Sequence, residues 1–438
     1  MATNSIPVQH SISPRREPLV GAYVWLLLFM VIYCARPEDW IPGLMAVPLA
    51  KITGILALIA LLLAMGDIRQ RLPREIVYLI LLLAQIWLTV PFSPVWRGGA
   101  FENALEFSKV APIVIVMVLT VTSVRRLRRL LLIQIVSVAI IAAVALWKGH
   151  MLGGRLEGAL NGNYENPNDL AFSIVLTLPL CLVFFFTARN RLLKVIWVLA
   201  MVVMIYAVFL TASRAGLICL LVATAISLWE FAIQGRRRYL IPIVAGAGIL
   251  LWAYAGGGVR SRLGSTFYSN NPAEDSAYAS TQARWDLLVQ SLKVTAQHPL
   301  FGVGPGNFTV VSGNWHVAHN SFTQMSSEGG VLAFLLFVSI LWRGFRNIRN
   351  TKRLARVGES NLLARGFQAS LAAFVVGSFF ASESYQFFTY FLVAYSTALY
   401  QITARGVAVG RREGSVNLPI RERALEKTVE LDALRSLC

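Results

Sequence analysis

An arginine and a histidine stand at the ends of apolar segments, where charged or titratable side chains are uncommon, and a second arginine lies in the long loop between them. Arg214 lies in a short turn, TASRAG, between two apolar runs, and Arg284 precedes the sequence WDLL. His319 comes just before another apolar run. Guanidinium groups bind oxyanions bidentately, so two of them suit a phosphate or pyrophosphate. The imidazole suits a general base, although it could equally cap the next helix, and either arginine could snorkel or pair with Asp286.

A stretch rich in Gly, Asn and His leads up to His319 and beyond it. It reads HPLFGVGPGNFTVVSGNWHVAHNSFTQMSSEGG, and its glycines permit the tight turns that bulkier residues resist. Asn307 and Asn320 are candidate ligands to the substrate, and Glu328 either supports the site or pairs with a cation. His316 forms an HxxH pair with His319, but no further ligand follows at a familiar spacing. We therefore expect no metal.

Two further candidates could contact a sugar. Asn168 lies in the Asn-rich segment NGNYENPNDLA, where amide side chains either bind hydroxyl groups or form turns and helix caps. Trp285 could stack on a sugar face or belong to the aromatic belt of a membrane protein. Its spacing with Leu288, Val289 and Leu292 predicts an amphipathic helix at the membrane surface.

The composition predicts a helical membrane protein that positions these residues. The chain has 438 residues, of which 56% are hydrophobic and only 14% are charged, against about 25% charged in a typical soluble domain. Long apolar runs predict an all-α, polytopic integral membrane protein with about twelve spans. These are expected near residues 19–35, 48–65, 76–91, 108–122, 130–147, 169–187, 192–210, 216–233, 239–255, 320–342, 366–382 and 386–403.

The net charge of +18 does not indicate nucleic-acid binding, because the basic residues form short clusters between apolar runs. Alternate connections carry these clusters, as the positive-inside rule expects, and this places the N-terminus in the cytoplasm. The four cysteines have no zinc or disulfide spacing. The predicted division is a cytoplasmic segment of residues 1–18, spans one to nine in 19–255, a large periplasmic loop in 256–319, three spans in 320–403 and a basic cytoplasmic tail in 404–438.

Taken in order, the motifs TASRAG, ARWDLL, HPLFGVGPGNF and HNSFTQMSSEGG resemble those of the O-antigen ligase and O-antigen polymerase superfamily. The resemblance covers residues 161–330, and the twelve-span layout extends it. It implies a GT-C-like inner-membrane glycosyltransferase that needs no metal or cofactor. It also implies that Arg214, Arg284 and His319 match the family's essential residues, with Asn320 beside the histidine and Asn168 in the family's Pro-Asn pattern.

The resemblance further implies the substrates and partners. The donor would be a glycan on undecaprenyl pyrophosphate at the periplasmic face, and the acceptor would be lipid A core, a growing glycan or a protein. A chain-length regulator is a possible partner. The segment RPEDWIPG, residues 36–43, is typical of ligase-like proteins in exopolysaccharide or surface-glycosylation systems and favours a ligase over a polymerase. Two other classes stay open, a transporter of polysaccharide or lipid carrier and a non-catalytic scaffold.

Overall fold

The chain folds as a helical bundle in a computed structural model that describes residues 19–39, 41, 43–44, 47–67, 72–152, 155–158, 164, 166–254, 276–313 and 316–416. Within these residues the only strands are β1 (Met151–Leu152) and β2 (Arg155–Leu156), which pair antiparallel. The predicted all-α class is therefore confirmed. The predicted N-terminal segment lies outside the described residues, as do residues 417–438 of the predicted tail.

Seven helical segments in the described part of the chain are long and apolar enough to cross a membrane. They are α3 (Arg74–Phe92), α4 (Arg97–Ser108) joined to α5 (Val110–Thr120), α6 (Val124–Lys148), α7 (Pro167–Thr187), α8 (Arg191–Leu210), α9 (Arg214–Ser227) with the π-helical turn η5 (Leu228–Ile233), and α14 (Ser321–Leu354). Three shorter apolar helices are α1 (Val20–Ala35), α2 (Leu49–Leu63) and α10 (Leu240–Tyr254). A polytopic membrane protein is thus confirmed.

The count of twelve spans stays a prediction. Each predicted span overlaps a helix, the last two being α15 (Glu359–Gly377) and α16 (Phe387–Val416). However, α15 and α16 are not among the seven segments that meet the length and composition expected of a span. The helix α16 also continues to Val416, beyond the predicted end at residue 403.

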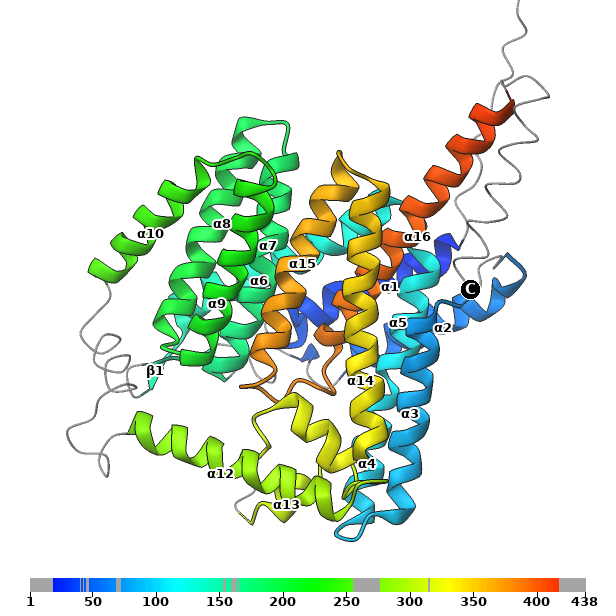
Figure 1. The fold of residues 1–438 in the computed structure, drawn as a ribbon, viewed down its shortest axis with the longest axis vertical. Helices are drawn as coiled ribbons and strands as arrows, with labels where there is room; N and C mark the ends of the chain where they lie inside the picture. Colours follow the sequence, from blue (N-terminus) through cyan, green and yellow to red (C-terminus); the bar gives the residue numbers. More distant parts are fainter. Residues whose placement is uncertain are drawn as a thin grey trace, which may run out of the picture.

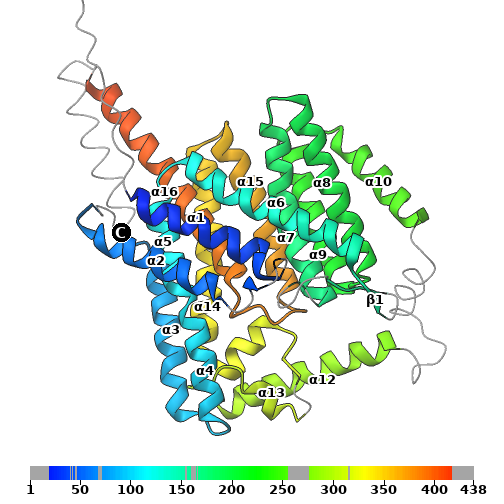
Figure 2. The same ribbon diagram turned by 180° about the vertical axis from the view of Figure 1, so that it is seen from behind.

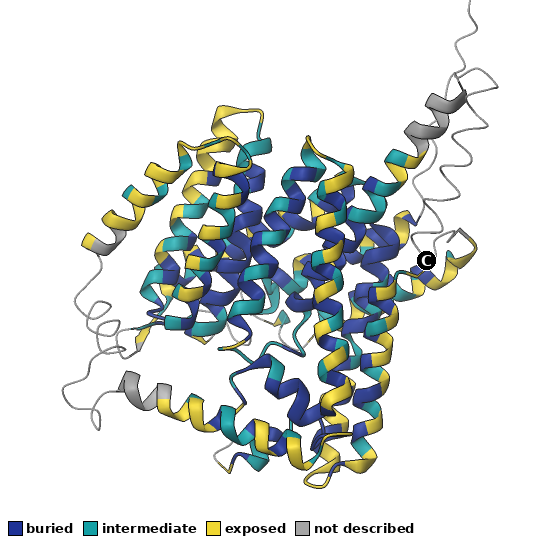
Figure 3. Cartoon of the chain, in the orientation of Figure 1, coloured by how far each residue is buried: buried dark blue, intermediate teal, exposed yellow. Residues whose placement is uncertain are grey.

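The bundle has two groups of helices with α15 between them. Helices α7, α8 and α9 form one group, and α3, α5 and α14 belong to the other, as Figure 1 shows. Helix α15 packs on α7 and α9 on one side and on α14 and α16 on the other. Helices α1 and α6 cross behind the bundle (Figure 2). Buried residues concentrate in the middle, while α8 and α10 on the outside are largely exposed (Figure 3).

Helix α12 (Ser276–Gln297) and the short α13 (Phe308–Val311) lie across one end of the bundle (Figure 1). Both belong to the predicted large loop, whose residues 255–275 lie outside the described part. The α7–α8, η5–α10 and α14–α15 connections, which carry basic clusters, lie at the opposite end. This one-sided arrangement is the pattern that the positive-inside rule predicts, although the side that faces the cytoplasm stays a prediction.

The amphipathic helix predicted around residue 285 is present as α12, and its two faces have different surroundings. Leu287, Ser291 and Val294 are buried on the face that packs toward α14, where the Thr295 hydroxyl lies 2.9 Å from that of Ser326. Trp285 and Leu292 are more than half exposed. Of the apolar stripe that the spacing predicts for the membrane surface, Trp285 and Leu292 are thus exposed, while Leu288 and Val289 are half-buried.

Candidate active site

Arg214 is the first residue of α9, and a strained turn places it there. Ala212 has a left-handed backbone with φ 48°, and Ser213 caps the helix by accepting a hydrogen bond from the Gly216 amide at 3.1 Å. A Cβ atom on Gly216 would lie 2.7 Å from Cβ of Ala171 in α7, so this position needs glycine. The helix N-terminus, with its positive dipole end, favours an anion beside the guanidinium.

His319 has the same kind of position before α14. Its backbone is left-handed, with φ 49°, and Asn320 caps the helix by accepting bonds from the amides of Phe322 and Thr323 at 2.9 and 3.1 Å. A left-handed residue other than glycine costs ~1–3 kcal/mol, and such residues cluster at functional sites. The predicted alternative for His319, a helix cap, is wrong, because the cap is Asn320.

The three candidate catalytic residues share one electrostatic environment although they are distant in sequence. Burial and the charge of Arg214 lower the pKa of Arg284. Burial, followed by the charges of Arg284 and His316, lowers the pKa of His319 to about 4. His319 is therefore neutral near pH 7 and able to accept a proton, beside two guanidinium groups that attract an anion.

A comparison with known families gives the class of protein. Residues 199–338 match the family model described as O-antigen ligase. The match covers Arg214, Arg284 and His319, and it confirms the resemblance that the motifs indicated. It also confirms the prediction of a glycan-transferring enzyme, here a membrane enzyme of the O-antigen ligase or polymerase type that acts in lipopolysaccharide biosynthesis. No curated protein matches the chain in sequence.

A third arginine, which the sequence analysis did not single out, braces the turn of this O-antigen ligase-like region. The Arg155 guanidinium, on β2, donates to the Thr211 carbonyl at 3.1 Å and to Asn168 Oδ1 at 2.9 Å. Asn168 Oδ1 also accepts a bond from the Ser213 hydroxyl at 2.7 Å. Asn168, a predicted substrate ligand, thus holds the turn that carries Arg214. The sequence signal for Arg155 is its place in a connection predicted to face the periplasm, where the positive-inside rule expects few basic residues.

The connection between α15 and α16 forms a second support, beneath His319. The Ser321 hydroxyl donates to the Ala381 carbonyl at 2.6 Å and accepts from the Glu383 amide at 2.8 Å. Burial, and then the negative charge of Asp169 in α7, raises the pKa of Glu383 to about 8. Asp169 follows Asn168 of the first support, and Glu383 belongs to the second. The two supports therefore meet where the carboxyl groups of Asp169 and Glu383 lie close to each other. Asp169 and Glu383 both lie outside residues 199–338, which match the family model.

The glycine-rich segment wraps around the start of α14. The amides of Val303 and Gly304 donate to the Ser327 and Glu328 carbonyls at 2.9 Å each. Gly302 and Gly304 have positive φ, and a Cβ atom on Gly302 would lie 2.4 Å from the Glu328 carbonyl carbon. The glycines are thus required by this close approach of two backbones. At Gly330 itself the backbone of α14 is not helical.

Two predicted substrate ligands lie inside this packing. Glu328 is 1% exposed. Burial raises the pKa of the nearby Tyr385 hydroxyl, and the negative charge of Glu328 raises it further. Asn307 is also 1% exposed and donates to Ser93 Oγ at 2.8 Å and to the Trp96 carbonyl at 2.9 Å. These contacts fit a structural role for Asn307, and Glu328 lies beside Tyr385 in the interior.

The remaining candidates lie at the edge. Trp285 is 61% exposed and lines an open groove of about 690 Å³ with Asp286, Gln290 and Lys293. His316 is exposed, yet its charge reaches His319. In the described part of the chain no group of three His, Cys, Asp or Glu side chains is arranged for a metal ion. The metal-free expectation remains a prediction.

Proposed function

We propose that the protein transfers a glycan from undecaprenyl pyrophosphate to an acceptor hydroxyl, with inversion at the anomeric carbon and without a metal. The observation that carries this proposal is the convergence of Arg214, Arg284 and a neutral His319. The O-antigen ligase match over residues 199–338 supports the reaction class. The residue roles rest on the mutual charge effects of these residues.

The pyrophosphate belongs with the two arginines. Arg284 loses solvation and feels the charge of Arg214, so a bound dianion would offset the repulsion between the two guanidinium groups. The N-terminus of α9 adds its amides to the same anion. As the bond between sugar and phosphate breaks, negative charge grows on the leaving group, and fixed cations stabilise that change most.

His319 takes the role of base. Its lowered pKa keeps the imidazole unprotonated at neutral pH, so a ring nitrogen accepts the proton of the acceptor hydroxyl. The acceptor oxygen bonds to the anomeric carbon as the carbon–oxygen bond to the phosphate breaks. The electron pair of that bond leaves with the carrier pyrophosphate, and attack from the opposite face inverts the carbon.

The location and the acceptor follow from the same reasoning. We place the site on the periplasmic face of the inner membrane, because the basic connections lie at the end opposite α12. The acceptor is lipid A core, a growing glycan or a protein, and the RPEDW segment favours a ligase. A polymerase would use the same donor, leaving group and base. A chain-length regulator would be a partner of the polymerase.

A reconstituted transfer assay tests this function. Purified protein in liposomes receives carrier-linked glycan, candidate acceptors and excess EDTA. The wild type is expected to release carrier pyrophosphate, while Arg214→Ala, Arg284→Ala and His319→Ala are not. Lys293→Ala is the matched control, since Lys293 is exposed on another face of α12. The size of the product separates a ligase, with one addition, from a polymerase, with a ladder.

The transporter alternative makes the opposite prediction. Transporters place their charged groups near the bilayer midplane, whereas Arg214 and His319 stand at helix ends. Movement of labelled carrier across sealed vesicles, with no transfer to any acceptor, would overturn the glycosyltransferase proposal. Loss of transfer in EDTA would overturn its metal-free form.

A further inference from the structure

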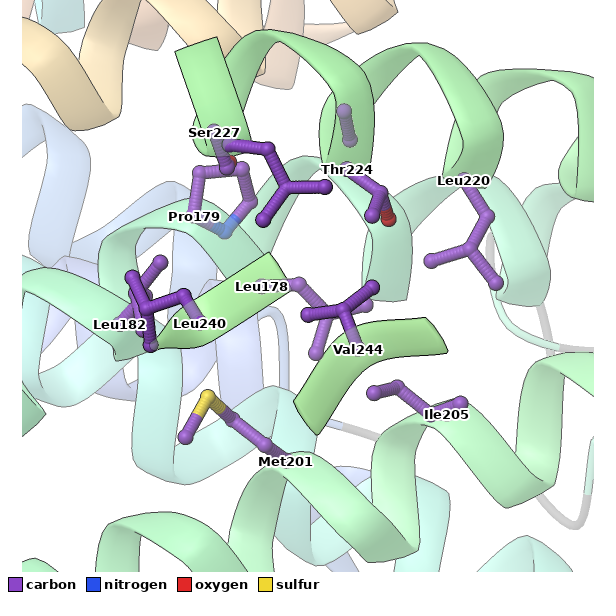
Figure 4. Close-up of a pocket in the computed structure, with 12 residues that line it drawn as sticks. Leu178, Pro179, Leu182, Met201, Ile205, Leu220, Thr224, Ser227, Leu240 and Val244 are labelled. Atoms are coloured by element: carbon purple, nitrogen blue, oxygen red, sulfur yellow. The ribbon is translucent and has the colours of Figure 1, made fainter. Parts of the chain in front are cut away.

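An apolar cavity lies between α7, α8, α9 and α10, away from the charged site. Its volume is about 140 Å³, and its wall is almost entirely aliphatic (Figure 4). Cavities of ~150 Å³ with aliphatic walls stay dry and bind molecules the size of benzene. A sugar would lose its hydrogen bonds there. The wall residues include Leu178, Leu182, Met201, Ile205, Leu220 and Val244.

Helix α10 covers this cavity loosely. Leu240 and Val244 are the two residues of α10 that line it, and both are half-buried, whereas Ile243 and Ile249 are 60% and 69% exposed. Among the described elements, α10 has substantial contact only with η5. Figure 1 shows α10 at the outer side of the bundle. The cavity is thus half open and is covered on one side by a loosely packed helix, so a lipid chain can enter it.

A continuous face of α9 connects the cavity to Arg214. Arg214, Leu217, Leu221, Thr224 and Leu228 follow the spacing i, i+3, i+7, i+10 and i+14, which places them on one face of a helix. Thr224 and Leu228 line the cavity, and Leu221, on the way to it, is 70% exposed. At ~1.5 Å per residue, Thr224 lies roughly 15 Å along the axis from Arg214.

We propose that this cavity binds one isoprene-sized unit of the donor's polyprenyl chain, while its pyrophosphate lies at Arg214 and Arg284. The inference rests on the proposed function and adds a binding site for the tail. An apolar chain that starts at a phosphate beside Arg214 meets the exposed Leu221 first and the cavity next. Because the wall is aliphatic, its contribution grows with the apolar area removed from water.

Chain-length dependence tests the proposal. Val244→Trp fills the cavity from α10, and Ile243→Trp adds the same side chain on the exposed face of the same helix. Each variant receives one donor with a full-length polyprenyl chain and one with a single isoprene unit, too short to reach the cavity. We expect Val244→Trp to raise KM for the long donor about tenfold and to leave the short donor unchanged. Activity on the short donor shows that the variant is folded.

The other outcomes are distinct. If the wild type transfers from both donors while the two variants behave alike, the cavity does not bind the chain and the proposed function stands. If the wild type transfers from neither donor, the proposed function is wrong, and the tail site falls with it. Native mass spectrometry adds a direct readout. A phospholipid that stays bound in excess long-chain carrier, but is lost in Val244→Trp, would overturn the proposal.

Discussion

The two ends of the bundle use the same residue types in opposite ways. At the end away from α12, cations are paired with buried carboxylates. Lys352 Nζ lies 2.7 Å from Glu230, and Arg343 lies 2.8 Å from Glu75, with both acids less than 5% exposed. At the α12 end, Arg214, Arg284 and His319 instead act on one another's charge. Buried carboxylates thus pair with cations at the first end, while at the second end the proposed anionic ligand would offset the repulsion between Arg214 and Arg284.

The difference also appears in the helices that carry these groups. Helix α9 begins with Arg214 at one end and continues into η5, where Glu230 lies at the other. The Glu230 carboxylate accepts a hydrogen bond from Lys352 Nζ, and the Arg365 guanidinium lies close by. One continuous helical segment thus connects a satisfied ion pair to a site that attracts a ligand. Substitutions at the two ends should therefore separate stability from activity.

The largest expected effect is at His319. We expect His319→Asn to lower kcat by a factor of ~10²–10⁴, because a positioned base contributes that much. Asparagine tolerates the left-handed backbone, so the loss reports the base and not the turn. The transfer assay measures kcat, and the melting temperature is the control. Activity within a factor of two of the wild type would remove His319 from the mechanism.

The pH profile sharpens this assignment. Because the pKa of His319 is lowered to about 4, log kcat/KM of the wild type should stay flat from pH 7 down to about 5 and fall below that. His316→Gln removes a positive charge near His319. Its removal favours the protonated form of the His319 imidazole, so the acid limb should move to higher pH. An acid limb that is unchanged in His316→Gln, or that lies near pH 6.5 in the wild type, would contradict the proposed environment.

The arginines come next in expected effect. Arg284→Lys keeps the charge but loses the planar, bidentate contact, and we expect kcat/KM to fall by a factor of ~10²–10³, as when one stabilising donor is removed. At the opposite end Arg343→Lys makes the same change beside Glu75. It should leave kcat/KM within a factor of two. Equal losses in both variants would mean that the two ends do not differ in function.

Breaking a pair at the opposite end should affect stability instead. Lys352→Met removes the close cation from the buried Glu230 carboxylate. Among the contacts of this carboxylate in the described residues, the more distant one to Arg365 then remains. Since loss of one partner of a buried pair costs ~3–5 kcal/mol, and Arg365 remains, we expect about 2–3 kcal/mol. Chemical denaturation in detergent micelles measures it. Activity per folded molecule should not change, and a loss there would show that the ends are coupled.

Much of this contrast was predictable from sequence, because it depends on local patterns. Apolar runs and basic clusters predicted the helices, and the motifs around Arg214, Arg284 and His319 indicated the family whose model residues 199–338 match. The supports were not predictable. Arg155 and Glu383 lie in short connections without periodicity, and only the packing of α7 and α15 brings them to the site. Asn307 as a substrate ligand stays a prediction, because a polar residue beside glycines fits a loop contact, such as those to Ser93 and Trp96, as well as a ligand.

The hydrogen bonds by which Arg155 holds the turn before Arg214 can be tested in the same way. The expected loss of activity is smaller than for the Arg284 and His319 variants. Arg155→Gln removes the bonds to the Thr211 carbonyl and to Asn168 that hold the turn before Arg214. We expect kcat/KM to fall about tenfold, or ~1.4 kcal/mol. Arg155→Lys, which keeps one donor, should recover part of the loss. A positioning role predicts that KM for the donor rises in both variants, whereas a purely structural role would lower the melting temperature and leave KM unchanged.

The smallest expected effect concerns the carboxyl pair that joins the two supports. The pKa of Glu383 is raised from 4.5 to about 8, so the folded state binds its proton more tightly than the unfolded state does. Stability should therefore be highest below pH 4.5 for this group and fall as the pH rises through about 8. Glu383→Gln cannot ionise, so its melting temperature should exceed that of the wild type at pH 8.5 and approach it at pH 5.5. A constant difference between the two proteins would show that Glu383 is already ionised at neutral pH, and Asp169 would then face a second charge instead of a proton donor.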